Sequence, residues 1–543
     1  MGLAEVRDKV GPHMNESAAR LEDCNRPAAT QASQAAAHDP TEALIAWLRE
    51  YAAHRINSAV IDERRTIAPH IVLDLGNQGL LGMQIPPEHG GLLGLNHVQL
   101  LQMQRQLGAI DLTLAFFVGL NNGLGVRPIL RFAQPQLQQR YLPALATGRI
   151  LAAFAISEPG AGSNPLAVAA RAQREGDGYR VTGTKLWCGS AAWASVISVF
   201  ARHLDPNGRA LGHVGLCIDA MQPGLRVGKE ALTMGLRGMV QNDLHLDRAY
   251  VGADRVLGSP FAGLSIAGDV MAFGRLGIAA TAVGGLWRAL QLMVRYASRR
   301  QISSGLLYAN GHVQRVIGQT RLAAFTLDRF VNSIAAMLDR AESVPPELNA
   351  AAKLLASEAL WQAADAAVQM LGGRGYCENN GAPQLLRDAR ITRLFEGPSE
   401  TLASFIGQRT WTSQASHFSD LFARCPNAGA TDRAGLQGFL AALAQRYPTG
   451  AGQAADDLFV PLGYAVAWQL VAACAPAAGQ PEASWLQHQV ELARARVLAL
   501  APACAPPAPC ALAREIAAHI GDIEQAAAGV ESDLDPYLRS SMQ

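Results

Sequence analysis

Hydrophobic positions in the first third of the chain follow a helical period. From Pro40 to about Gly148, apolar residues recur three and four positions apart, as in "TEALIAWLREYAAHRI" and "NHVQLLQMQRQLGAI". Such spacing places the apolar side chains on one face of an amphipathic helix. Glycine and proline interrupt it, most clearly in "IPPEHGGLLG". The pattern predicts an N-terminal α-helical domain over residues 41–150.

The pattern changes to short alternating runs at about Leu151 and keeps this character to Pro260. Examples are "YRVTGTKLWC", "SVISVFAR" and "HVGLCIDA", which glycine, aspartate and proline separate. Short runs rich in β-branched residues and bounded by turn residues are typical of strands. We therefore expect a middle β-domain over residues 151–262.

Long helical periods return at about Leu264 in three stretches, beginning "AGDVMAFGRLGIAATAVGG", "HVQRVIGQTRLAAFTLDRF" and "NAAAKLLASEALWQAADAA". Their length suits a helical bundle, predicted over residues 263–407. Further helical segments, broken by "APACAPPAPC", predict a C-terminal helical extension over residues 408–543. Residues 1–40 show no core pattern, so we expect a flexible leader there.

Composition narrows the function classes. A chain of 543 residues is too long for one core, and 46 basic against 45 acidic residues give a net charge of +1. This balance does not favour nucleic acid as a partner. Eight scattered cysteines without a CxxC pair favour reduced thiols in a cytoplasmic protein, with no metal site.

Two segments bear on targeting. The first residues, "MGLAEVRDKVGPHMNESAAR", contain no apolar core of the kind found in secretory signals, so we do not expect export. The most apolar window is residues 458–474, which includes a proline and a glycine. It is marginal for a bilayer, which needs about 20 apolar residues. A buried helix is the favoured interpretation, and a weak interfacial contact stays open.

Six motifs resemble, in order and spacing, those of the acyl-CoA dehydrogenase family. They are "FAISEPGAGSN", "GDGYRVTGTKLWCGSA", "MGLRG", "GRLGIAATAVG", "QMLGGRGY" and "RDARITRLFEGPSE", and the resemblance covers residues 42–407. It implies a mainly α fold with a β-domain: an N-terminal helical domain, a middle β-barrel-like domain and a four-helix bundle. It also implies FAD as cofactor, a homodimer or homotetramer, and an electron-transfer flavoprotein or another electron acceptor as partner.

The resemblance assigns FAD binding to residues of several motifs. These are Phe154, Ile156, Ser157, Ser163, Trp187, Cys188, Gly189, Arg300, Gln369, Gly372, Gly373, Pro398 and Glu400. Glycines of "SEPGAGS" suit this role because their backbone N–H groups can approach phosphate and flavin oxygens.

The chain departs from the family pattern at several of these positions. Gly189 and Pro398 stand where threonine is more usual, and Ser303, Ser304 and Gly311 replace a Phe, Gly and Gln. The departures predict that FAD binds either more loosely or in a reshaped pocket.

Glu396 is the candidate base. The apolar run before it should bury its carboxylate and raise its proton affinity, as removal of a weakly acidic α-proton requires. By resemblance, Glu396 takes the α-proton of an acyl thioester while flavin N5 takes the β-hydride. The Glu396 N–H then holds the thioester carbonyl. Some family members carry the base at the position that Gly274 occupies in this chain. Glycine has no side chain that could act as a base.

Substrate contacts are expected from Ser163, Arg275 and Gly397. The family often has an aspartate three residues before the matched arginine, and this chain has Ala272. This change leaves two carriers open, coenzyme A and an acyl carrier protein. The neighbouring "RDAR" segment, residues 387–390, predicts a structural ion-pair network.

Two other functions stay open at this point. An acyl-thioester oxidase would pass the electrons to O2 on the same fold. A noncatalytic assembly or binding protein would account for the altered flavin positions, with the C-terminal extension as its docking surface. For the extension itself we favour an amphipathic role in stabilising a dimer.

Overall fold

The computed structural model describes residues 40–425, 430–446, 453–475, 479–500 and 507–521. The expected flexible leader thus lies outside the described residues, apart from Pro40. Two compact units divide the chain at Leu48 and Arg49. Of the first unit only the beginning of helix α2 (Pro40–Arg55) is described, and the paragraphs below concern the second.

Short helices make up the N-terminal part of the second unit. They are α3 (Ser58–Arg64), α4 (Pro69–Asn77), α5 (His97–Ile110), α6 (Leu112–Leu120), α7 (Arg127–Phe132) and α8 (Pro135–Ala146). Asn96 begins α5 with a capping box shared with Gln99, and the Asp111 carboxylate caps α6. Six residues of π-helix, Asn121–Val126, join α6 to α7. The local sequence therefore fixes where these helices begin.

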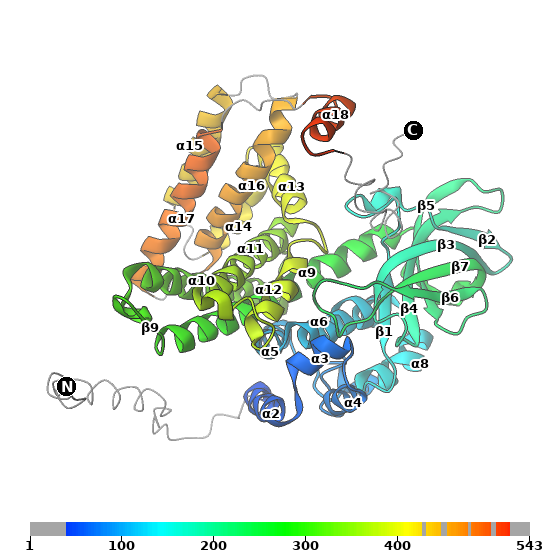
Figure 1. Ribbon diagram of the computed structural model, residues 1–543. Coiled ribbons are helices and arrows are strands. Elements are labelled where there is room, and N and C mark those ends of the chain that lie inside the picture. The colour runs from blue at the N-terminus through cyan, green and yellow to red at the C-terminus, as the bar shows by residue number, and fades with distance from the viewer. Residues whose placement is uncertain (1–39, 426–429, 447–452, 476–478, 501–506, 522–543) are drawn as a thin grey trace, which may run out of the picture. The chain divides into compact units, whose positions relative to one another are not determined.

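Eight strands form one sheet, coloured cyan to green at the right of Figure 1. They are β1 (Ala152–Ala155), β2 (Arg171–Glu175), β3 (Gly178–Gly189), β4 (Val196–Leu204), β5 (Ala210–Asp219), β6 (Leu225–Glu230), β7 (Gln241–Gly252) and β8 (Val256–Leu257). The order is β6-β7-β3-β2-β4-β5-β8, with β1 on β4. β1 and β2 pair with β4 in parallel, and the remaining pairs are antiparallel.

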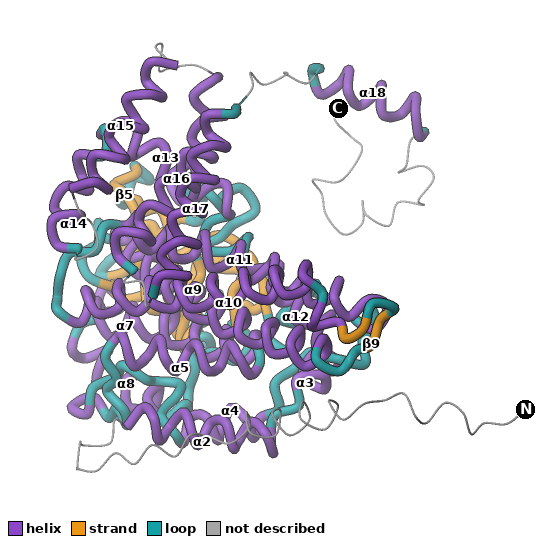
Figure 2. The backbone as a smooth tube through the Cα atoms, turned by 90° about the vertical axis from the view of Figure 1, so that its left-hand side faces the viewer, coloured by secondary structure: helices purple, strands orange, loops and turns teal. Residues whose placement is uncertain are grey.

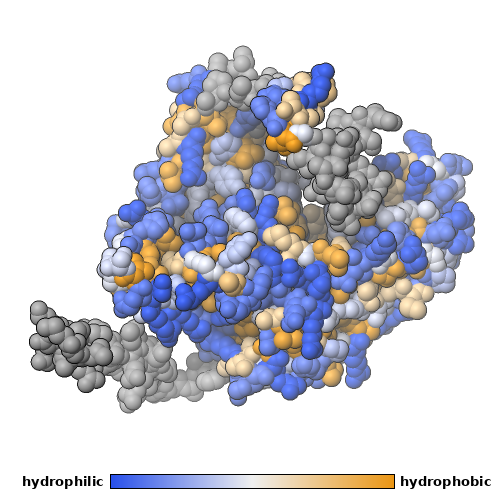
Figure 3. All heavy atoms as spheres, viewed as in Figure 1, coloured by the Kyte–Doolittle hydropathy of each residue, from blue (hydrophilic) through white to orange (hydrophobic). Residues whose placement is uncertain are grey.

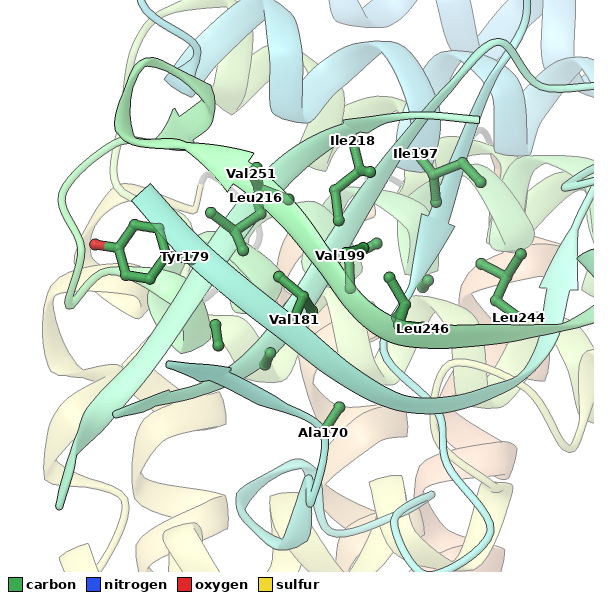
Figure 4. Packing of buried hydrophobic residues seen from close by; sticks show 14 of the residues in the cluster. Ala170, Tyr179, Val181, Ile197, Val199, Leu216, Ile218, Leu244, Leu246 and Val251 are labelled. Carbon is green, nitrogen blue, oxygen red and sulfur yellow. The ribbon is translucent and has the colours of Figure 1, made fainter. Parts of the chain in front are cut away.

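Strand β4 contributes to two cores because its side chains alternate. Ile197 and Val199 lie in the sheet core with Val181 and Leu216 (Figure 4). Phe200, on the opposite face, belongs to a second core shared with helices α8 and α9. Burial on both faces explains why this strand is apolar almost throughout.

The bundle consists of α9 (Gly263–Ala297), α10 (Gly311–Asp339), α11 (Pro346–Leu371) and α12 (Gly381–Thr392). A small hairpin, β9 (Gln301–Ile302) and β10 (Gly305–Leu306), separates α9 from α10. Helices α9, α10 and α11 lie side by side (Figure 2), and α5 also packs on α9. The fold class expected from the sequence, mainly α with a β-domain, is confirmed.

Further helices follow the bundle. They are α13 (Ser399–Ser413), α14 (Ser419–Arg424), α15 (Ala430–Arg446), α16 (Gln453–Cys474), α17 (Gln480–Leu498) and α18 (Pro509–Ile520). Helix α16 packs on α13, α11 and α17. The additional C-terminal helices expected from the sequence are therefore present.

Two described helices are long and apolar enough to cross a membrane by length and composition alone. One is α9 and the other is the window Asp457–Cys474 of α16, and 61% and 67% of their apolar windows are buried in the protein. Core helices meet the same criteria, and the face in Figure 3 carries mostly hydrophilic residues, with hydrophobic ones in small groups. The burial confirms the prediction of a buried helix at residues 458–474.

Candidate active site

Glu396 lies in the short connection between α12 and α13. Its φ of 51° and the φ of 102° at Gly397 turn the chain sharply, and Pro398 precedes the first turn of α13. A left-handed conformation is uncommon for a residue with a side chain, so the surroundings must hold it. Among the described residues, no group accepts a hydrogen bond from the Glu396 N–H.

The Glu396 carboxylate is buried against α9. Both of its oxygens are shielded from solvent and make no hydrogen bond within the described part of the chain. A Cβ atom at Gly274 would overlap Oε2 and lie 2.7 Å from Oε1, so the carboxylate fills the space that a side chain there would need. Burial raises the pKa of Glu396 to about 7, although Arg275 and Lys353 lower it. Such a carboxyl can take up a proton near neutral pH.

The origin of this burial differs from the sequence-based interpretation. The apolar run before Glu396 does not enclose the carboxylate, because Leu394 is 44% exposed. Phe395 packs edge-on against Phe116 of α6, with ring centroids 5.1 Å apart. The close approach to Gly274, which is 122 positions away in the sequence, supplies the cover.

Two basic side chains, one half-buried and one fully buried, hold the connection by its carbonyl groups. Arg275 Nε donates to the Glu396 carbonyl at 3.0 Å, and Lys353 Nζ donates to the Gly397 carbonyl at 2.7 Å. Lys353 is fully buried, and this burial lowers its pKa to about 7. Arg275, which we expected to contact substrate, holds the Glu396 turn. Lys353 was missed, although it is the one charged residue in "NAAAKLLAS".

An apolar cavity of about 20 Å³ lies beside Gly274. Leu100 of α5, Phe116 and Leu120 of α6, and Phe273 of α9 line it. A Cβ atom at Gly189 would lie 3.7 Å from Leu120, so the end of strand β3 reaches the same region. The Glu396 carboxylate and the end of strand β3 therefore both lie next to residues that line this cavity.

The loop "SEPGAGS" is fastened by a buried ion pair that the sequence did not reveal. Lys185 Nζ lies 2.6 Å from Glu158 Oε1, and both side chains are almost fully buried. The Glu158 carboxylate also accepts the N–H groups of Ala169 and Ala170, at 2.6 and 3.0 Å. The sequence signal that could have revealed this pair was an acid, Glu158, in one motif and a lysine, Lys185, in the next.

Beyond Glu158 the loop is open. Ser163 is exposed, and a Cβ atom at Gly160 or Gly162 would meet no atom within 4 Å. Ile156 and Ser157 are half-buried, and their carbonyls already accept from Lys185 Nζ and the Leu186 N–H. Approach to a ligand is therefore left to the N–H groups and the serine hydroxyls of this loop.

Strand β3 presents Trp187 and hides Cys188. A register shift between Lys185 and Cys188 gives Trp187 a φ of 54° and leaves its side chain 62% exposed. Cys188 is buried in the sheet core, which raises its thiol pKa to about 12. Only the backbone of Cys188 can therefore serve a flavin. Phe154, on β1, is half-buried with its ring 5.0 Å from that of Phe200.

The residues expected at the adenine end of FAD lie elsewhere. Arg300, Gln369, Gly372 and Gly373 are exposed. They share one end of the bundle, because α9 and α11 pack together there through Ala297 and Ala367. Helix α9 carries the chain from the base region to that end, and 23 residues of helix span about 35 Å. A single chain does not bring this group to Glu396.

The donor set fits a flavin dinucleotide. The exposed indole of Trp187 suits a ring system, and the loop glycines with open space around them suit a pyrophosphate. The exposed Arg300 cation and the exposed glycines at the same end of the bundle suit a nucleotide. Pro398 is half-buried and Glu400 exposed at the start of α13.

Within the described ranges, no three His, Cys, Asp or Glu side chains gather as metal ligands.

The "RDAR" segment is only partly an ion-pair network. Arg387 pairs with Asp62 and with Glu378, as predicted. Asp388 instead accepts the Leu236 N–H at 2.6 Å, and burial raises its pKa to about 8. The Arg390 guanidinium lies over the Trp361 ring and forms no ion pair with the described residues. Neighbouring rings and backbone groups, as well as charges, therefore determine the contacts of this segment.

Three family models match the chain. They are the N-terminal domain of acyl-CoA dehydrogenase over residues 38–149, the middle domain over 153–249 and the C-terminal domain over 262–410. Human short-chain specific acyl-CoA dehydrogenase is 33% identical over 346 residues, which cover 63% of this chain and 82% of the relative. Rat very long-chain specific acyl-CoA dehydrogenase is 28% identical over 335 residues, 60% of this chain and 51% of the relative.

Solved structures agree on the fold. The acyl-CoA dehydrogenase of Bacillus anthracis in complex with FAD gives a TM-score of 0.71 at 21% identity, covering 86% of this chain and 90% of that one. The prolyl acyl carrier protein oxidase AnaB gives a TM-score of 0.65 at 25% identity, covering 69% and 99%.

Proposed function

This chain belongs to the acyl-CoA dehydrogenase family, and we propose that it oxidises an acyl thioester to the 2-enoyl thioester with Glu396 as base. Members of this family are FAD-dependent flavoprotein oxidoreductases, so the chain is an enzyme of that class. The observation that carries the proposal is the buried Glu396 carboxylate, with its oxygens unpartnered by the described residues.

In the proposed step the Glu396 carboxylate takes the α-proton, and the electron pair of that C–H bond forms the new double bond. Bound FAD supplies the two-electron acceptor for the hydride that leaves the β-carbon. The free N–H of Glu396 would donate to the thioester carbonyl and acidify the α-carbon. Arg275 and Lys353 keep the base in place through the two carbonyl groups of its turn.

The size of the cavity supports a small acyl group. About 20 Å³ beside Gly274 leaves little room beyond the reacting carbons unless Phe116 moves. A short acyl chain would fill this space and exclude water, which strengthens the local electrostatics. The relatives include both short-chain and very long-chain specific acyl-CoA dehydrogenases, so the cavity and not the comparison supports this substrate class.

A second cavity, of about 310 Å³, is proposed for the polar arm of the thioester. Arg127, Arg131, His97 and Asp339 are among its lining residues. Both arginines pair with Asp269, at 2.9 and 3.4 Å, and Asp339 is bound by His97, so the two guanidinium groups are the donors that suit a phosphate. Coenzyme A and a carrier-protein pantetheine share this phosphate chemistry.

Residues that would hold FAD are those that the structure leaves accessible. They are Ser157, Ser163, Trp187, Gly189 and the backbone of Cys188 near the base, with Arg300, Gln369, Gly372 and Gly373 at the far end of the bundle. Because the two groups lie far apart on one chain, we propose a homodimer or homotetramer in which two chains complete each flavin site.

Anaerobic bleaching of the FAD-loaded protein tests the reaction. Butyryl-CoA and hexadecanoyl-CoA are compared, together with butyryl thioesters of an acyl carrier protein. Rapid loss of the yellow colour with a short chain supports the proposal, and no bleaching with any thioester contradicts it.

An oxidase is the second candidate, because AnaB is described as an oxidase. In air it would form one hydrogen peroxide per enoyl product without another acceptor. A dehydrogenase would turn over quickly only with an electron-transfer flavoprotein or a dye.

A further inference from the structure

We propose that helix α16 of the C-terminal extension positions the Glu396 turn, by fixing the helix that begins directly after it. This inference rests on the proposed role of Glu396 as base. It assigns the extension a part in the chemistry, beyond the dimer-stabilising role that the sequence favoured.

Helices α13 and α16 meet backbone to backbone at two points. A Cβ atom at Gly463 of α16 would overlap the Ala403 carbonyl oxygen and lie 2.8 Å from Ala403 Cα. A Cβ atom at Gly407 of α13 would overlap the Phe459 carbonyl oxygen and lie 3.0 Å from Phe459 Cα. The partners are four residues apart on each helix and therefore share one face. The crossing leaves no freedom for α13 to shift toward α16.

Helix α13 transmits this constraint to the base. It starts at Ser399, and Leu402, the neighbour of the contact residue Ala403, packs on the turn. A Cβ atom at Gly397 would lie 2.9 Å from Leu402 Cδ2. Displacement of α13 would therefore move Leu402 away from Gly397 and loosen the turn.

A polar contact runs in parallel with this packing. Glu358 of α11 accepts from Arg393 Nε at 2.7 Å and from Ser399 Oγ at 2.6 Å, one on each side of the Glu396 turn. Tyr464, next to Gly463, is close enough to this carboxylate that burial, followed by the charges of Glu358 and Glu400, raises the pKa of Tyr464. The extension thus lies near the carboxylate that binds both flanks of the turn.

The face of α16 that meets α13 is buried along its length. Leu462, Val466 and Leu470 are fully buried, at the spacing of one helix face, on the same side as Gly463. This burial anchors α16 in the protein, so the contact with α13 has a rigid base.

The test compares Gly463→Ala with Gly438→Ala in the FAD-loaded protein. Gly438 lies on α15, where an added Cβ would meet nothing within 4 Å. Since displacement of a catalytic group by 1 Å can cost about 100-fold, Gly463→Ala should lower kcat by about 10- to 100-fold. KM and FAD content should stay constant. Gly438→Ala should leave all of them unchanged.

Two readouts separate positioning from loss of structure. Amide hydrogen exchange of residues 393–398 should accelerate in Gly463→Ala, and the acid limb of the kcat/KM profile should shift. Tyr464→Phe, which keeps the packing and removes the hydroxyl near Glu358, should lower kcat about 2- to 5-fold, as expected for loss of one polar interaction. If Gly463→Ala does not fold, hydrogen exchange in Tyr464→Phe decides.

The inference is overturned if the Gly463 and Tyr464 variants both match the wild type in kcat, exchange and pH profile. Glu396→Gln in the same assay distinguishes the two proposals. Full activity of Glu396→Gln removes the proposed function, whereas an inactive Glu396→Gln beside an unaffected Gly463→Ala removes only the role of α16.

Discussion

The two ends of the proposed flavin site are built in different ways. At the base end, Glu396 is buried, its turn is fastened by Arg275 and Lys353, and Gly274 leaves room for one carboxylate. At the other end, Arg300 and Gly372 are exposed, with open space around the glycine. The Glu396 end is held by several elements of one chain, whereas the described residues leave the other end open to solvent.

This difference follows from what each end has to do. A base must hold an unfavourable buried charge in one geometry, which requires contacts from several elements of one rigid core. A nucleotide tail needs only accessible donors and a cation, which an exposed helix end can offer. Substitutions at the base end should therefore affect kcat, and those at the far end FAD affinity.

Glu396→Gln should have the largest effect. Removing the carboxylate while keeping the shape should lower the rate of anaerobic bleaching by about 1000-fold, within the usual range for a lost general base. FAD content and melting temperature should stay close to those of the wild type. Bleaching at an unchanged rate would show that another group takes the proton.

Gly274→Ala should follow, with a loss of about 100-fold in kcat, because the new methyl group displaces the carboxylate. Gly268→Ala on the same helix is the control, since a Cβ there meets nothing within 4 Å. Steady-state kinetics with a dye acceptor measure both. Equal activity of the two variants would place the carboxylate away from Gly274.

Lys353→Met should destabilise the protein and alter its pH dependence. The Gly397 carbonyl loses its buried donor, which costs about 1–3 kcal/mol of unfolding free energy. Lys353 lowers the pKa of Glu396, so its removal should move the acid limb of kcat/KM to higher pH. Denaturant unfolding measures the free energy of unfolding, and kcat/KM over a pH series measures the acid limb. Lys229→Met, at an exposed lysine, is the control.

Arg300→Ala should have the smallest effect on catalysis. Loss of one exposed cation should weaken FAD binding about tenfold, with kcat of the loaded protein unchanged. Titration of the FAD-free protein with FAD measures the FAD affinity, and Arg299→Ala is the control variant. A loss of kcat at full FAD occupancy would mean that this end also shapes the chemistry.

The sequence predicted the order of helical, β and helical regions, because each has its own hydrophobic period. It also singled out Glu396, since its motif is local. What covers Glu396 could not be predicted, because Gly274 and Lys353 meet it only through the packing of α9 and α11 on the turn. The sequence likewise gave no sign that Cys188 faces the core, because a register shift sets its direction.

The pH dependence of anaerobic flavin bleaching at low substrate tests the central claim most directly. Because burial raises the pKa of Glu396 to about 7, the wild-type rate should be low at pH 5.5 and rise through an apparent pKa of about 7. The residual rate of Glu396→Gln should lack this rise. A wild-type rate that is flat from pH 5.5 to 8.5, or the same rise in Glu396→Gln, would contradict the assignment of Glu396 as base.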